Sequence, residues 1–230
     1  MRNTLSEGLP KLGLDLSDET QNTLCAFGKA VVEQNKVMNL TAITEPAAVA
    51  KLHLLDSLSL LTLENLAGKK VIDVGCGAGF PGVPVKIACP EMKLTLLDSL
   101  GKRMNWLETV LPTLGVDAEC VTARAEEAVQ TRRESYDYAT SRAVARLNIL
   151  LELTAPYVKV GGKVLAMKGT AAQEELAEAK NAISKLGLQV ERVAEFPVDG
   201  TAHTVIVLKK TAPTPKQYPR RYAKIKQNPL

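Results

Sequence analysis

The residues best suited to bind a ligand are glycines that follow an apolar stretch ending in an acidic residue. Residues 71–82 read VIDVGCGAGFPG, where Asp73 comes just before Gly75, Gly77, Gly79 and Gly82. Such glycines let the chain turn sharply after a strand and approach a ligand closely. The last three also fit the dinucleotide pattern G-x-G-x-x-G, so the loop alone leaves NAD, S-adenosylmethionine and a turn without a ligand open. Asp73 favours S-adenosylmethionine, because its carboxylate suits the amino group of the methionine moiety.

A second acidic residue, Asp98, ends the next apolar run, 19 residues after Gly79. A carboxylate at this distance accepts hydrogen bonds from the ribose hydroxyls of an adenosine. Ligands of open α/β sheets lie beyond the carboxyl ends of the strands, so Ala125 and Glu126, which follow the third apolar run, are expected beside the adenine. Structural alternatives stay open for both acids: Asp98 as the cap of a helix starting near Ser99, and Glu126 as an acid favoured by a helix N-terminus.

Positive residues border the same expected cleft. Arg142 ends the fourth apolar run, Arg146 follows one helical turn later, and Lys168 ends the fifth run. Such a rim suits a phosphate-bearing substrate, although each cation taken alone is more often a surface charge. The Asn-Pro-Pro-Tyr type motif of amino-methylating enzymes is absent, as is a Pro-Cys pair for attack on cytosine C5. With both motifs absent, the candidate substrate contacts beside a methyl donor are the positively charged residues of this rim.

Short apolar runs and the segments between them predict the elements that position these residues. Strands are expected at 70–74, 93–98, 118–122, 136–141, 162–168, 188–197 and 202–209. The first six are separated by segments long enough for a helix, which is typical of βαβ units in a parallel sheet. The turn at Asp199-Gly200 is too short for a parallel crossover, so the seventh strand should run antiparallel to the sixth. This is the α/β plan of class I S-adenosylmethionine-dependent methyltransferases: a Rossmann-like seven-stranded sheet with an antiparallel C-terminal hairpin.

Three regions are expected along the 230 residues: an N-terminal helical cap at 1–66, a Rossmann-like methyltransferase domain at 67–210 and a basic C-terminal tail at 211–230. The net charge of +4 is unevenly distributed, because residues 200–230 hold seven Lys or Arg and no acid, which leaves −3 for the rest. With its prolines, this end of the chain reads as an extended basic arm that binds polyanions. The alternative is a solvated, disordered terminus.

The composition excludes several classes of protein. A chain with 46% hydrophobic and 23% charged residues is neither wholly disordered nor collagen-like. The longest stretch without a charged residue spans only 74–85, so no membrane-spanning helix is expected. Acidic residues near the N-terminus argue against a secretory signal, and a cytoplasmic location is expected. The four cysteines are widely spaced, so neither a metal site nor a disulfide framework is expected.

Several segments together resemble one family closely, the bacterial 16S ribosomal RNA guanosine-N7 methyltransferases RsmG, also called glucose-inhibited division protein B (GidB). They are VMNLTAIT (37–44), HLLDSL (53–58), VIDVGCGAGFPGVPVKI (71–87), LTLLDSLGKRMNWL (94–107), ARAEE (123–127), SRAVARL (141–147), LAMKG (165–169) and YPRR (218–221). These segments cover the helical cap, the sheet and the tail. GFPG followed by LLDSLGKR is much more specific than a generic glycine loop.

The resemblance implies transfer of the methyl group of S-adenosylmethionine to N7 of a guanosine in the 530 loop of 16S rRNA. Its partner would be 16S rRNA or a small-subunit assembly intermediate. It also implies a cofactor held by Gly75, Phe80, Ala125, Glu126 and Arg142, to which the residue patterns add Gly77 and Asp98. No catalytic acid or base is expected, because guanine N7 has a free lone pair and no proton to lose. The segment RYAKIK (221–226) lacks the Gly and Pro expected there in this family, so no single contact carries over.

Other functions remain as alternatives. A basic tail argues against a methyltransferase for a small metabolite. An NAD-dependent oxidoreductase would lack its acid, because the sequence has no Tyr-x-x-x-Lys pair and its two histidines lie in the cap and on a late strand. A non-catalytic or different-target RNA-binding ribosome-assembly factor on a methyltransferase fold stays open until turnover is measured. A monomer without an obligate protein partner is expected.

Overall fold

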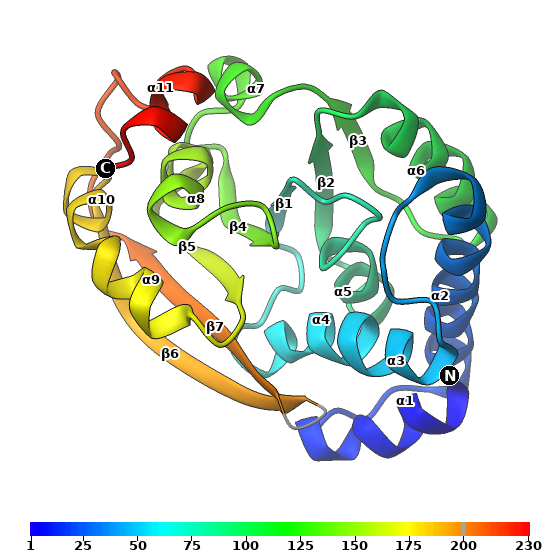
Figure 1. The fold of residues 1–230 in the computed structure, drawn as a ribbon. Helices are drawn as coiled ribbons and strands as arrows, with labels where there is room; N and C mark the ends of the chain where they lie inside the picture. The colour runs from blue at the N-terminus through cyan, green and yellow to red at the C-terminus, as the bar shows by residue number, and fades with distance from the viewer. Residues whose placement is uncertain (199–200) are drawn as a thin grey trace.

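All seven expected strands are present in the computed structural model, which describes residues 1–198 and 201–230. They are β1 (Lys70–Val74), β2 (Lys93–Asp98), β3 (Glu119–Thr122), β4 (Tyr136–Arg142), β5 (Val158–Lys168), β6 (Leu188–Val198) and β7 (Thr201–Lys210). Their order across the sheet is β3-β2-β1-β4-β5-β7-β6 (Figure 1). Strands β1 to β5 pair in parallel, whereas β7 is antiparallel to both β5 and β6. The predicted α/β sheet and its C-terminal hairpin are confirmed; the turn at Asp199-Gly200 lies outside the described residues.

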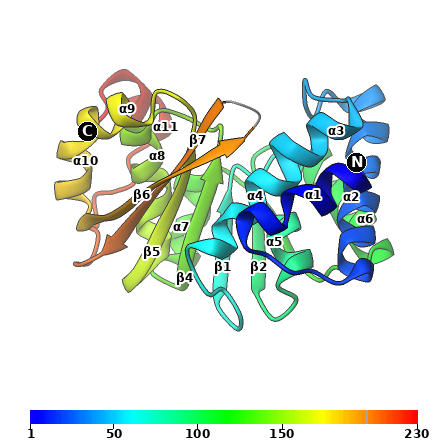
Figure 2. The same cartoon turned by 90° about the horizontal axis from the view of Figure 1, so that it is seen from below.

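Helices cover both faces of this sheet (Figure 2). One face carries α1 (Arg2–Gly8), η1 (Pro10–Leu12), α2 (Asp18–Met38), α3 (Pro46–Val49), η2 (Ala50–Leu55), α4 (Asp56–Leu58), η3 (Ser59–Thr62), α5 (Gly82–Ala88) and α6 (Gly101–Thr113). The other carries α7 (Ala125–Arg132), α8 (Leu147–Thr154), η4 (Ala155–Tyr157), α9 (Ala172–Glu178) and α10 (Lys180–Lys185). None of the described helices is long and apolar enough to cross a membrane.

Successive residues of a strand belong to two different apolar cores, one on each face of the sheet. In β1, Val71 belongs to the core that contains the N-terminal helices, whereas its neighbour Ile72 belongs to the core that contains α8 and α10. In β2, Leu96 and Leu97 divide in the same way. Side chains alternate between the faces of a strand, so a sheet covered on both sides needs continuous apolar runs. This requirement explains why the strands could be located in the sequence.

The C-terminal segment after β7 does not form the extended arm that its charge suggested. It folds back against α8 and α10 and ends in α11 (Tyr222–Gln227) (Figure 1). Tyr218 is 6% exposed and Ile225 is fully buried. Two of the expected free cations are paired inside the molecule, Lys210 with Glu134 and Arg220 with Glu152. These acids lie far away in the sequence, which is why the composition of the tail alone could not reveal the pairing.

Candidate functional site

A cavity of about 380 Å³ opens beyond the carboxyl ends of β1, β2 and β4. We call it the glycine-loop cavity. The predicted residues that line it are Gly75, Asp98, Ala125 and Glu126. The structure thus brings together residues that are up to 51 positions apart in the sequence, as the rule for ligand sites in open α/β sheets predicts.

Asp98 connects the wall of this cavity to the loop. The residue is 7% exposed; its Oδ2 accepts a hydrogen bond from the Gly77 N–H at 3.0 Å, and its Oδ1 accepts one from the Leu100 N–H at 2.9 Å. Each carboxylate oxygen offers more than one acceptor site. Asp98 can therefore hold the loop and the start of α6 and still receive the hydroxyls of a ligand, so the two functions considered for it are compatible.

Gly75 is one of the positions at which the loop requires glycine. Its φ is +72°, in the left-handed region, and a Cβ atom placed on it would lie 2.4 Å from Val144 Cγ2. Val144 lines the same cavity from the segment after β4. The close approach of the two segments thus defines one wall of the cavity.

Replacing Gly75 by Ala is expected to strain the backbone and displace Val144. A left-handed non-glycine residue costs roughly 1–2 kcal/mol, and the steric clash adds to that. The matched control is Gly115→Ala, because Gly115 has a φ of +67° and a Cβ atom placed on it would meet nothing within 4 Å. Chemical unfolding should show a larger loss of stability for Gly75→Ala, and calorimetry should show weaker S-adenosylmethionine binding for that variant alone. Equal losses in both variants would contradict this description of the loop.

Asp73 lies behind the loop and does not face the cavity. It is fully buried; Oδ2 accepts a hydrogen bond from the Gly82 N–H at 2.8 Å, while Oδ1 has no partner among the described residues. Burial raises the pKa of this carboxyl to about 7. The expected contact between Asp73 and a ligand amino group is therefore wrong for this structure. An acid at the end of a strand can bind a ligand or hold the loop that follows, and the sequence does not distinguish these two roles.

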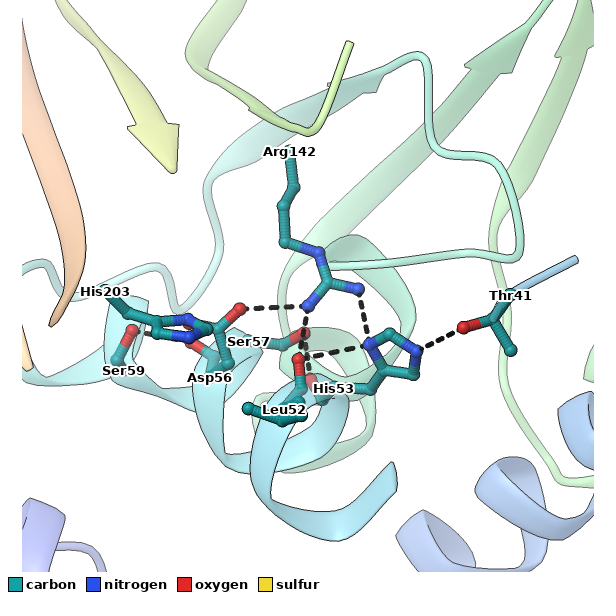
Figure 3. A network of polar contacts seen from close by, with 8 residues as sticks. All are labelled: Thr41, Leu52, His53, Asp56, Ser57, Ser59, Arg142 and His203. Carbon is teal, nitrogen blue, oxygen red and sulfur yellow. Dashed lines mark hydrogen bonds and ion pairs between the residues drawn. The ribbon is translucent and has the colours of Figure 1, made fainter. Parts of the chain in front are cut away.

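A second cavity, of about 700 Å³, lies next to the first; we call it the Arg142 cavity. Ala143 and Val144 line both cavities and form the boundary between them. The Arg142 guanidinium lies on the side of the second cavity. It donates to the Leu52 carbonyl and to Asp56 Oδ2, both at 2.9 Å (Figure 3). The structure therefore places Arg142 at the boundary of the two cavities, held by the N-terminal helices.

Phe80 packs beneath this arginine. It is 5% exposed, its ring lies 4.7 Å from that of His53 and 5.4 Å from that of Phe27, and the Arg142 guanidinium carbon lies 5.1 Å from its centroid. A cation over an aromatic face is attracted by the ring quadrupole. Phe80 therefore supports Arg142 and the turn after the glycines.

The two histidines of the chain occupy opposite electrostatic environments. The Arg142 guanidinium cannot accept a hydrogen bond, so His53 Nδ1 must accept the 3.0 Å hydrogen bond from it, although the Leu52 carbonyl also lies 3.1 Å away. The proton then resides on Nε2, which donates to Thr41 Oγ1 at 2.8 Å (Figure 3). Burial and the nearby Arg142 charge lower the pKa of His53 to about 4. His203 instead has its pKa raised by its hydrogen bond to Asp56, at 2.8 Å.

We expect these two histidines to titrate on opposite sides of the ordinary value of about 6.5. As the pH falls from 8 to 5, His203 should gain its proton first, whereas His53 should remain neutral. Histidine ring NMR signals can follow both residues, and the variant His203→Gln assigns them, since the chain has only two histidines. If both rings titrated together near 6.5, the Arg142–Asp56 network described here would be wrong.

The other two predicted rim cations are already paired. Arg146 contacts Glu174 and Glu178 at 2.7 and 2.8 Å, and the side chain of Lys168, 6% exposed, contacts Glu175 at 2.8 Å. Helix α9 therefore neutralises much of the expected positive rim. These acids follow β5 in the sequence, and no local pattern indicated that they would turn back towards Arg146.

Sequence reasoning missed several residues that line the glycine-loop cavity, among them Arg103, Val144 and Tyr222. The segment LGKR directly after Asp98 offered a signal for Arg103, because it places that residue in the first turn of α6. Nothing in the sequence connects Tyr222 to a cavity formed mainly by residues 74–144.

Comparisons with known proteins show which family and which fold this chain is similar to. A family model described as GidB, rRNA small subunit methyltransferase G, matches residues 20–203. A protein from Alkaliphilus metalliredigens (strain QYMF), described as Ribosomal RNA small subunit methyltransferase G, is 43% identical over 98% of this chain and 97% of its own length. A protein of the same description from Lactobacillus johnsonii is 44% identical over 96% of each chain.

Solved structures are similar in fold. A TehB-like SAM-dependent methyltransferase from Corynebacterium glutamicum aligns with a TM-score of 0.55 and 17% identity over 80% of this chain and 98% of that one. TYW2 from M. jannaschii, in complex with AdoMet, aligns with a TM-score of 0.54 and 12% identity over 64% and 71% of the two chains. These similarities show the class I methyltransferase fold. The near full-length sequence identity goes further and shows that the chain belongs to the rRNA small subunit methyltransferase G (GidB) family.

Proposed function

We propose that this protein transfers the methyl group of S-adenosylmethionine to N7 of a guanosine in the 530 loop of 16S rRNA, in the cytoplasm. The observation that carries the proposal is the pair of adjoining cavities, one at the glycine loop and one at Arg142, which share Ala143 and Val144. A methyl donor in the first would lie beside a base in the second. Membership of the family supports an S-adenosylmethionine-dependent rRNA methyltransferase, and the resemblance to the RsmG family implies that the methylated atom is N7.

The glycine-loop cavity fits this cofactor in size and chemistry. Its volume of about 380 Å³ lies within the range of roughly 300–1,000 Å³ typical of small-molecule sites. The carboxylate of Asp98 suits ribose hydroxyls, and the left-handed Gly75 allows close approach of the backbone. We propose that the cofactor is held by Gly75, Gly77, Phe80, Asp98, Ala125, Glu126 and Arg142, with Arg142 acting from the boundary between the cavities.

The reaction requires the protein to position the two reactants and does not require it to transfer a proton. The bound cofactor supplies an electrophilic methyl group, and guanine N7 supplies a lone pair that carries no proton. His53 is not needed as a base, and its Nδ1 is already occupied by Arg142. Aligning two reactants can supply about 7–11 kcal/mol of the barrier. We therefore name no catalytic acid or base.

Arg142 has donors left for the substrate. A guanidinium carries five N–H groups, and the contacts to Leu52, Asp56 and His53 use three of them. Guanine O6 is an acceptor next to N7. We propose that the target base enters the Arg142 cavity and that a remaining N–H group of Arg142 donates to O6.

The test is methyl transfer from labelled S-adenosylmethionine to 16S rRNA transcribed with guanosine or with 7-deazaguanosine, each as free RNA and in reconstituted small subunits. Label should enter the guanosine RNA in one of these two states and should not enter the 7-deaza RNA. Equal labelling of both RNAs would place the methyl group on another atom and contradict the proposal. RNA binding without any transfer would favour the non-catalytic assembly factor instead.

A further inference from the structure

The far wall of the glycine-loop cavity is made by the end of the chain. Tyr222, the first residue of α11, lines this cavity together with Ala125, Glu126 and Leu153. Tyr222 is partly exposed, and its hydroxyl has no hydrogen-bond partner among the described residues. We infer that the C-terminal segment 211–230 is part of the cofactor site and that Tyr222 contacts the adenosine half of the cofactor. This inference rests on the proposed function for the identity of the cofactor.

The segment is fixed to the domain at several points before it reaches the cavity. Glu134 Oε1 accepts a hydrogen bond from the Thr214 N–H at 2.9 Å, and Arg133 donates to the carbonyl oxygens of Thr214 and Tyr218. Tyr218 is itself buried. A chain tethered in this way has little freedom to move away from the cavity.

The strongest attachment lies two residues before Tyr222. Glu152, on α8, is fully buried, and it accepts three hydrogen bonds from Arg220: from the backbone N–H at 2.8 Å, from Nε at 2.9 Å and from an Nη at 2.6 Å. A bidentate arginine and carboxylate pair fixes both position and orientation. Ile225, fully buried on the next turn, holds the other side of α11. Tyr222 is thus held against the cavity from both sides.

The position of Tyr222 selects one half of the cofactor. It lines the glycine-loop cavity beside Ala125 and Glu126, which follow β3, and it does not line the Arg142 cavity. The β3 end is where the adenine of a ligand bound by Asp98 should lie. Aromatic rings bind nucleobases by stacking, because every base presents a π-face. A tyrosine beside this position suits adenine better than the charged methionine moiety.

A truncation of the tail should therefore affect two kinds of binding. Arg221, Lys224 and Lys226 are exposed on the same short segment and are available to rRNA phosphates. If residues 216–230 only bound RNA, their removal would weaken RNA binding and leave cofactor binding unchanged. With Tyr222 in the cavity wall, the same truncation should weaken both.

The test is the affinity of the full-length protein for S-adenosylhomocysteine and for 5′-methylthioadenosine, measured by calorimetry without RNA. Tyr222→Ala should weaken binding of both ligands by a similar factor, on the order of 5- to 100-fold for the loss of one stacked base. Tyr222→Phe, which keeps the ring, should remain close to the unchanged protein. Lys224→Ala is the matched control on the same helix and should leave both affinities unchanged. Thermal unfolding confirms that each variant is folded.

The outcomes separate this inference from the proposed function. Unchanged affinity of Tyr222→Ala for both ligands would overturn the inference, and the proposed function would stand. A loss confined to S-adenosylhomocysteine would also overturn it, because the contact would then be to the amino-acid half. If the unchanged protein bound neither ligand, the proposed function would fail as well.

Discussion

Asp98→Ala is expected to weaken S-adenosylmethionine binding by about 10- to 150-fold, which corresponds to about 1.5–3 kcal/mol for hydrogen bonds to a charged group. The substitution removes the acceptor proposed for the ribose hydroxyls. It also releases the N–H groups of Gly77 and Leu100, both of which donate to this carboxylate. Because the loop and the start of α6 lose a common anchor, the loss should lie towards the upper end of this range. Calorimetric titration of the purified variant measures it.

Two further variants make this measurement specific. Asp98→Asn keeps one oxygen acceptor and should lose less affinity than Asp98→Ala. Asp117→Ala removes an exposed acid and should leave the affinity unchanged. If Asp98→Ala bound S-adenosylmethionine as tightly as the unchanged protein, Asp98 would be a structural residue only, and the cofactor would have to be held elsewhere.

The second large effect concerns stability: Arg220→Ala should destabilise the fold by about 3–5 kcal/mol, the usual result of leaving a buried charge without its partner. Glu152 is fully buried, while the Arg220 side chain is 23% exposed and makes two of the three hydrogen bonds between these residues. For a chain of this size, each kcal/mol lowers the melting temperature by roughly 2–4 °C. Calorimetry or circular dichroism should therefore show a melting temperature roughly 6–20 °C lower.

A double variant separates the cost of leaving the Glu152 charge unpaired from the other effects of removing the Arg220 side chain. Adding Glu152→Gln to Arg220→Ala removes the buried charge and should recover a large part of the stability. Arg221→Ala is the matched control. Arg221 is the next residue in the sequence, and its exposed side chain has no ion pair among the described residues. A double variant no more stable than Arg220→Ala would show that the pair contributes through packing and not through charge.

The sheet and half of the site could be predicted because their signals are local. Strands buried on both faces, such as β1 and β2, require unbroken apolar runs, which are visible in the sequence. Parallel strands place their carboxyl ends at one edge, so the order of the runs was enough to bring Gly75, Asp98 and Glu126 together. The glycine loop could be predicted because glycine is the residue type that favours a positive φ, and Gly75, Gly77 and Gly79 adopt one in the structure.

The remaining features depend on partners that are distant in the sequence. Arg142 is held by Asp56, 86 residues earlier, and Arg220 by Glu152, 68 residues earlier. Pairs of this kind produce no periodicity or regular spacing in the sequence, so both arginines were expected to be unpaired charges. The same limit explains why the tail was expected to be extended and why Tyr222 was not connected to the cofactor cavity. The π-helical turn Ala50–Leu55, which carries His53, likewise looked like an ordinary helix in the sequence.

The central claim is tested most directly by mapping N7-methylguanosine in small-subunit rRNA through chemical cleavage at the modified base. The rRNA would come from cells that lack the protein and from the same cells supplied with either the unchanged protein or Asp98→Ala. We predict that one site in the 530 loop is lost without the protein, is restored by the unchanged protein, and is restored weakly or not at all by Asp98→Ala. An identical pattern of N7-methylguanosine in all of these cells would contradict the proposed function.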